Sequence, residues 1–161
     1  MSRLAKLVSI LIVSAGWASA SVAAPTVLHT VCGSTISTAT RTATGTFETP
    51  SEIPVLVPGG QFVVTVPAGT QRCIKLRFSA GAYCPHGCFL RVLDSNGLFQ
   101  PSANTSPILR FANNNEVEAH SFEWVQRVGP GRHIVKLQIQ TGNTIANAVF
   151  GPYTIVLEVT N

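Results

Sequence analysis

Charged side chains, methionine and long apolar stretches are all scarce in this chain of 161 residues. Only 11% of the residues are charged, and the single methionine is Met1. Beyond one short apolar run near the start, no stretch approaches the roughly 20 apolar residues that cross a bilayer as a helix. No later stretch follows the helical period of apolar residues either. The sequence therefore predicts no membrane span and argues against a helical domain.

The first 23 residues have the three-part layout of a secretory signal peptide. A basic start at Arg3 and Lys6 precedes an apolar run that begins at Leu7, and small residues follow the run. The spacing of small residues permits cleavage after Ala20 or after Ala23, and we favour Ala23. We therefore predict an exported bacterial protein, secreted or periplasmic, whose mature part is a single domain.

A clustered basic surface is also missing. Removing the signal peptide takes away two of the eleven Lys and Arg residues and none of the seven Asp and Glu residues, which leaves nine against seven. These nine are dispersed singly or in pairs, whereas a nucleic-acid-binding protein carries a basic face or stripe. The sequence thus argues against a nucleic-acid partner.

From Ile53 onward, apolar residues alternate with polar ones in short runs separated by Gly and Pro, which is typical of strands. Many short strands with evenly spaced turns predict an all-β fold, namely a two-sheet antiparallel sandwich of jelly-roll or another Greek-key type. The strands that we expect are Thr26–Cys32, Pro54–Val57, Gln61–Val66, Gln71–Ser79, Cys88–Asp94, Ile108–Ala112, Val117–Val128, His133–Gln140 and Tyr153–Thr160.

The chain divides into a signal peptide (1–23), an N-terminal arm (24–52) and a β-sandwich domain (53–161). The arm is rich in Thr, Ser and Ala and has few large apolar residues, so we expect it to be irregular, edge-lying or partly mobile. Within the domain, 62–78 and 122–139 share one pattern of strand, Pro/Gly corner and strand. We expect both corners to cross from one sheet to the other.

Three stretches of the domain carry a resemblance. They are the corner Val-Pro-Ala-Gly-Thr at 66–70, the strand His-Ser-Phe-Glu-Trp-Val at 120–125 and the hairpin Gly-Pro-Gly-Arg-His-Ile-Val-Lys-Leu-Gln at 129–138. Their pattern resembles that of small uncharacterised bacterial secreted proteins. At the level of the fold it is similar to jelly rolls of the complement-C1q and tumour-necrosis-factor type. The resemblance implies a jelly roll and carries no functional residue across.

Four cysteines in an exported chain of this size indicate two disulfides, for which three pairings exist. We favour Cys84–Cys88, because the Pro and Gly between them let the loop turn tightly, together with Cys32–Cys73. The second bridge would hold the arm on the sheet and would contribute about 3 to 4 kcal/mol by the loop-entropy model.

The loop from Tyr83 to Cys88 places Cys84 and His86 close together, as blue-copper loops place a Cys and a His. The Cys-to-His spacing is one residue short of that pattern and no Met follows, while zinc would need reduced thiols. Asp94 opens an Asp-Ser-Asn-Gly segment that suits a plain β-turn as well as calcium. We predict no metal and no cofactor, with Tyr83 and His86 as exposed candidates for ligand binding.

Two features suggest catalysis without establishing it. His120 and Ser121 are neighbours, but adjacent strand residues point to opposite faces, so they cannot form a dyad. No Gly-x-Ser-x-Gly elbow occurs. A pair of carboxylates for a small hydrolase would have to come from four scattered acids, and we predict no catalytic residue. These acids are Asp94, Glu116, Glu118 and Glu123.

Trp124 separates the two remaining hypotheses. Exposed, it would be an aromatic platform of a carbohydrate-binding module. However, it shares a strand face with Phe122, which favours the core. The leading hypothesis is therefore an exported, non-enzymatic module with a structural or partner-binding role. A carbohydrate-binding module is the alternative and a small secreted hydrolase comes third. Another protein or a glycan is the candidate partner, and the oligomeric state stays open.

Overall fold

The computed structural model describes residues 32–49, 51–85, 87–101, 108–110, 117–142 and 148–161. Within these ranges every regular element is a β-strand. No described helix is long and apolar enough to cross a membrane. The expected strand Thr26–Cys32 lies outside the described residues, except for Cys32.

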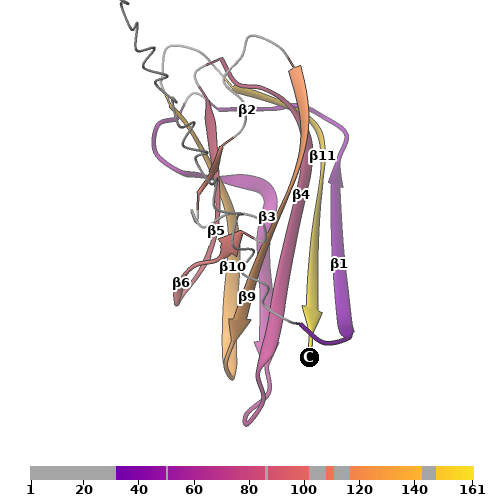
Figure 1. The fold of residues 1–161 in the computed structure, drawn as a ribbon. Coiled ribbons are helices and arrows are strands. Elements are labelled where there is room, and N and C mark those ends of the chain that lie inside the picture. The colour runs from indigo at the N-terminus through magenta and orange to yellow at the C-terminus, as the bar shows by residue number, and fades with distance from the viewer. Residues whose placement is uncertain (1–31, 50, 86, 102–107, 111–116, 143–147) are drawn as a thin grey trace, which may run out of the picture.

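Two antiparallel sheets face each other, as the alternating pattern predicted (Figure 1). Sheet A has the order β1 (Thr35–Ala43), β11 (Ala148–Thr160), β4 (Arg72–Tyr83), β9 (Val117–Val128) and β7 (Gln100–Pro101), with β2 (Phe47–Thr49) also paired to β11. Sheet B has the order β3 (Val55–Val66), β10 (Gly131–Thr141), β5 (Cys88–Asp94) and β6 (Gly97–Leu98), with β8 (Leu109–Arg110) also paired to β5.

The strands pair in nested order, first with last. β1 pairs with β11, β3 with β10, β4 with β9, and β5 with β6 and β8. A long hairpin rolled up in this way is a jelly roll, one of the two Greek-key alternatives that the sequence left open. The two similar corners join β3 to β4 and β9 to β10, and both cross between the sheets as predicted.

The core fills the space between the sheets. Each long strand sends alternate side chains inward, as the period-2 pattern requires. Trp124 on β9 is fully buried, pairs in register with Leu76 and packs beside Phe122 at 6.1 Å between ring centroids. Its predicted place in the core is confirmed, and its candidacy as a ligand-binding residue is wrong.

β3 runs as one strand through Pro58-Gly59-Gly60, where the sequence predicted a turn between two strands. Its register against β10 shifts between Lys136 and Gln138, which marks a β-bulge. At Gly60 a Cβ would lie 2.8 Å from the carbonyl oxygen of Val57, so only glycine fits there. The glycines therefore bend β3 without ending it.

The segment expected to be an irregular arm contains a regular strand. Thr35–Ala43 forms β1, which does lie at the edge of sheet A. The prediction failed because it weighed the lack of large apolar residues, whereas an edge strand is held by backbone pairing with β11 and by residues suited to strands, such as Thr.

Both disulfides are formed as predicted. Cys32–Cys73 and Cys84–Cys88 each have a Cα–Cα distance of 5.7 Å. Cys73 is buried and belongs to β4, so the first bridge ties the residues that precede β1 to the middle of sheet A. β1 is thereby held at its starting end.

A first prediction concerns Trp124. Trp124→Ala should lower the free energy of unfolding by about 3 to 5 kcal/mol, because it empties a fully buried aromatic site. Trp124→Phe is the control: it retains a ring and removes an indole N–H that has no hydrogen-bond partner among the described residues. Chemical denaturation should show a much smaller loss for this variant. A Trp124→Ala protein as stable as the wild type would contradict the core assignment.

Candidate functional site

The loop that suggested metal binding is closed by a disulfide. Cys84 and Cys88 are bonded to each other, and His86 between them lies outside the described residues. Tyr83, expected to be exposed, is half-buried at the end of β4. Among the described residues no three His, Cys, Asp or Glu side chains are grouped as metal ligands. The described part of the loop thus brings no set of functional groups together.

The His120 and Ser121 side chains point apart, as predicted from their adjacency. The imidazole Nε2 of His120 lies 2.8 Å from a carboxylate oxygen of Glu118, and the ring stacks on Phe122. The hydroxyl of Ser121 instead lies 2.8 Å from that of Ser79 on β4. The two side chains therefore lie on different faces of sheet A.

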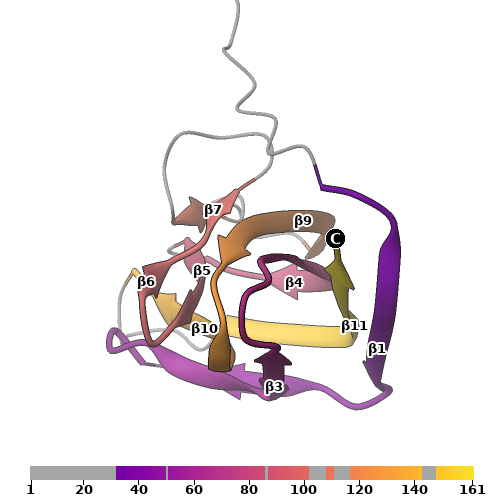
Figure 2. The same cartoon turned by 90° about the horizontal axis from the view of Figure 1, so that it is seen from below.

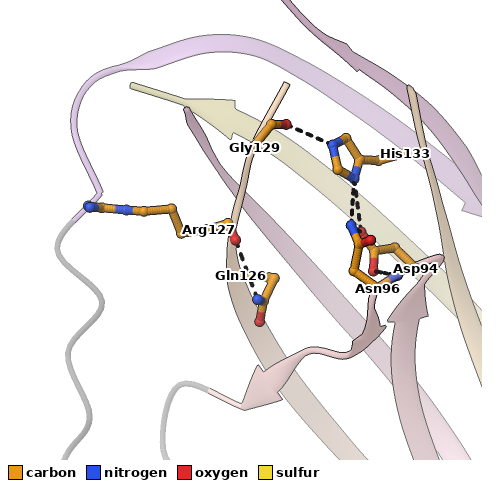
Figure 3. A network of polar contacts seen from close by, with 6 residues as sticks. All are labelled: Asp94, Asn96, Gln126, Arg127, Gly129 and His133. Carbon is orange, nitrogen blue, oxygen red and sulfur yellow. Dashed lines mark hydrogen bonds and ion pairs between the residues drawn. The ribbon is translucent and has the colours of Figure 1, made fainter. Parts of the chain in front are cut away.

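A buried polar network closes one end of the sandwich (Figure 3). The Nδ1 of His133 lies 3.0 Å from Oδ2 of Asp94, and its Nε2 lies 2.9 Å from the carbonyl oxygen of Gly129. A carbonyl only accepts, so Nε2 carries a proton and donates it. The backbone N–H of Asn96 donates to Oδ1 of Asp94 at 2.7 Å. In Figure 3 the Arg127 side chain points away from this network.

This network is structural. The cavity beside it holds about 90 Å³, well below the roughly 300 Å³ at which small-molecule sites begin. Both carboxylate oxygens of Asp94 accept hydrogen bonds from Asn96, Oδ1 from the backbone N–H and Oδ2 from the side-chain amide at 3.4 Å, as in a plain turn, and Oδ2 lies beside His133. Sequence reasoning missed the pair because 39 residues separate its members.

A groove lies on the side of the sandwich where β1 and β3 are the outermost of the described strands. We call it the lateral groove, and its volume is about 400 Å³. Among the described strands, β1 pairs only with β11 and β3 only with β10. Figure 2, which looks along the strands, shows β1 at one margin of the molecule. Its lining includes residues of both sheets, among them Ser37, Ala39, Phe62, Arg72, Leu157 and Val159.

The floor of the lateral groove is apolar and its β1 wall is made of small residues. Phe62, Leu157 and Val159 retain 5%, 4% and 8% exposure, whereas residues deeper in the core retain none. Ser37 and Ala39 pair in register with Val159 and Leu157, so they face the same way, yet both are exposed. Small side chains on β1 thus leave room above the apolar floor.

Arg41 closes one end of the lateral groove. This β1 side chain donates hydrogen bonds to the carbonyl oxygens of Gly59 (2.7 Å) and Gln61 (2.8 Å) on β3. Its guanidinium also lies 4.4 Å from the centre of the Phe62 ring. A single side chain, Arg41, therefore joins the edges of the two sheets. Sequence analysis missed this role because Arg41 lies in the segment predicted to be an arm.

A second donor supports the bulge of β3. The hydroxyl of Tyr153 on β11 donates to the carbonyl oxygen of Pro58 at 2.8 Å. Burial raises the pKa of the Tyr153 phenol above its ordinary value, so the proton needed for this bond stays in place. The bulge and the two donors together hold β3 over β11 and leave β1 uncovered.

The comparisons with known proteins leave the site to be judged on its geometry. No model of a known protein family and no curated protein matches the chain.

The role of the buried pair can be tested by mutation. Asp94→Ala and His133→Ala should each lower the free energy of unfolding by about 1 to 3 kcal/mol, because each leaves a buried polar partner without its hydrogen bond. The double variant should lose less than the sum of the two, since neither partner remains. Urea denaturation of the four proteins measures the coupling. Strictly additive losses would show that the two residues do not act together.

Proposed function

We propose that this chain is an exported, non-catalytic module that binds a protein partner at the lateral groove. The observation that carries the proposal is the uncovered wall of β1: Ser37 and Ala39 face the interior side of the sandwich and yet are exposed. Apolar floors next to exposed walls are typical of interaction sites. Export is supported by the signal-peptide layout of residues 1–23 and fits with two disulfides, which persist in oxidising compartments.

A carbohydrate-binding role lacks the feature that it most needs. Sugar binding on a sheet uses exposed aromatic rings. Within the described ranges every aromatic side chain is buried or half-buried, Trp124 completely so. The protein-binding proposal is favoured because the lateral groove needs no such platform.

A hydrolase has weak support from the candidate acids. Asp94 is bound to His133, and Glu123 lies 3.5 Å from the guanidinium of Arg77. Glu118 contacts His120, while Glu116 lies outside the described residues. The described acids thus have local partners and do not converge on the lateral groove.

Site-specific photo-crosslinking in the producing cell tests the proposal. A benzophenone side chain at Ala39, which lines the lateral groove, should give a discrete adduct with another protein. The neighbouring Thr40 is the matched control, because its side chain points to the opposite face of the same strand. Mass spectrometry of the adduct identifies its partner as protein. Absence of an adduct at Ala39, or equal adducts at both positions, would reject the lateral groove as a partner-binding site.

A further inference from the structure

Sheet B is one strand narrower than sheet A on the side of the lateral groove. Sheet A continues beyond β11 to β1, whereas sheet B ends at β3, which is held over β11 by the Tyr153 hydroxyl. β10 lies on one side of β3, and no described strand pairs with its other side, above β1. A strand in that position would cover Ser37 and Ala39 and complete the layer.

The open edge of β3 presents backbone groups for such a strand. The carbonyl of Gln61 faces Arg41, away from β10. Hydrogen-bonding groups alternate sides along a strand, so the N–H and C=O groups of Val63 and Thr65 face the same way as those of Gln61. Arg41 already occupies the Gln61 carbonyl, so an added strand would pair with Val63 and Thr65.

The charges around the lateral groove have one sign. Arg72 lines it on the side of sheet A. Arg41 lies at the other end. The groove lining includes no acidic residue among those described. Arg72 has no acidic partner within the described part of the chain. The basic rim favours an acidic ligand.

The same charges disfavour a second copy as the occupant. Antiparallel pairing of β3 with β3 of another copy would bring Arg41 of both chains to one seam. Like charges brought together in this way weaken association. An acidic peptide meets the rim with the opposite sign.

We propose that the lateral groove binds an extended acidic peptide, which adds as a strand to the open edge of β3. This inference rests on the proposed function and names its ligand class. The peptide backbone would bond to Val63 and Thr65, and alternate side chains would pack on Leu157 and Val159. Carboxylates near its ends would face Arg72 and Arg41.

Binding of a synthetic peptide to the purified exported protein tests the inference by fluorescence anisotropy. The probe is a peptide of about seven residues in which Val and Thr alternate between terminal Asp residues, a length that matches the open edge of β3. We expect saturable binding that weakens with added salt. The same peptide with Lys in place of Asp should bind at least about tenfold more weakly.

Two pairs of variants separate the backbone contribution from the charge contribution. Val63→Pro removes one N–H from the open edge and none from the ladder with β10, so it should weaken binding about tenfold, whereas Val63→Thr should change it little. Arg72→Ala should weaken binding several-fold. Lys75→Ala, which makes the same charge change on the outer face of sheet A, should have no effect.

N-methylated peptides keep the test decisive even if Val63→Pro fails to fold. Methylation of alternate residues in one register should abolish binding, and methylation in the other register should not, because only one side of an added strand bonds to β3. Equal effects of the two registers, or an affinity that Val63→Pro leaves unchanged, would overturn strand addition. Equal binding of the Lys and Asp peptides would overturn the acidic ligand.

Two further results would assign the lateral groove to another occupant, and a third would separate this inference from the proposed function. Concentration-dependent dimers that Val63→Pro abolishes would assign it to a second copy. Peptide binding that requires deletion of residues 24–31 would assign it to the chain's own segment. Failure of all the peptides, together with a protein adduct at Ala39, would overturn strand addition and leave the proposed function standing.

Discussion

The outermost strands of a sandwich carry backbone groups with no neighbouring strand, and on one side of this protein β1 and β3 both face that constraint. Exposed edges invite pairing with other chains, so folded proteins cover, charge or bend them. Here the bulge at Gly60 bends β3, and Arg41 and Tyr153 occupy the carbonyls of Pro58, Gly59 and Gln61. The stretch of β3 after Gln61 has no such occupant among the described residues.

Away from these open edges, two links within the protein hold the sheets. The Asp94–His133 pair and the Cys32–Cys73 bridge fix the sheets where the strands begin and end, and neither requires a partner from outside. Both links hold the strands that frame the lateral groove. A preformed groove of this kind would need little rearrangement to take the ligand that we propose.

Alternation of apolar and polar residues was enough to predict the class of fold and the inward face of Trp124, because both depend on local pattern. Cysteine chemistry was enough to predict both disulfides. β1 was missed because its stability comes from the backbone of β11, which no local apolar pattern reports. The lateral groove was missed for a related reason. It exists because residues of β1 and β3 that are distant in sequence fail to cover each other, and only the tertiary arrangement shows it. The Thr-rich run from Thr35 was the signal available, since β-branched residues favour strands.

Amide hydrogen exchange measured by NMR tests the open edge of β3 most directly. The N–H groups of Phe62 and Val64 face β10 and should be strongly protected, whereas those of Val63 and Thr65 should exchange many-fold faster, because no described strand lies beside them. This alternation along four consecutive residues is the result that an open edge predicts. Equal protection of all four amides would mean that another segment already pairs with β3, and it would contradict the account.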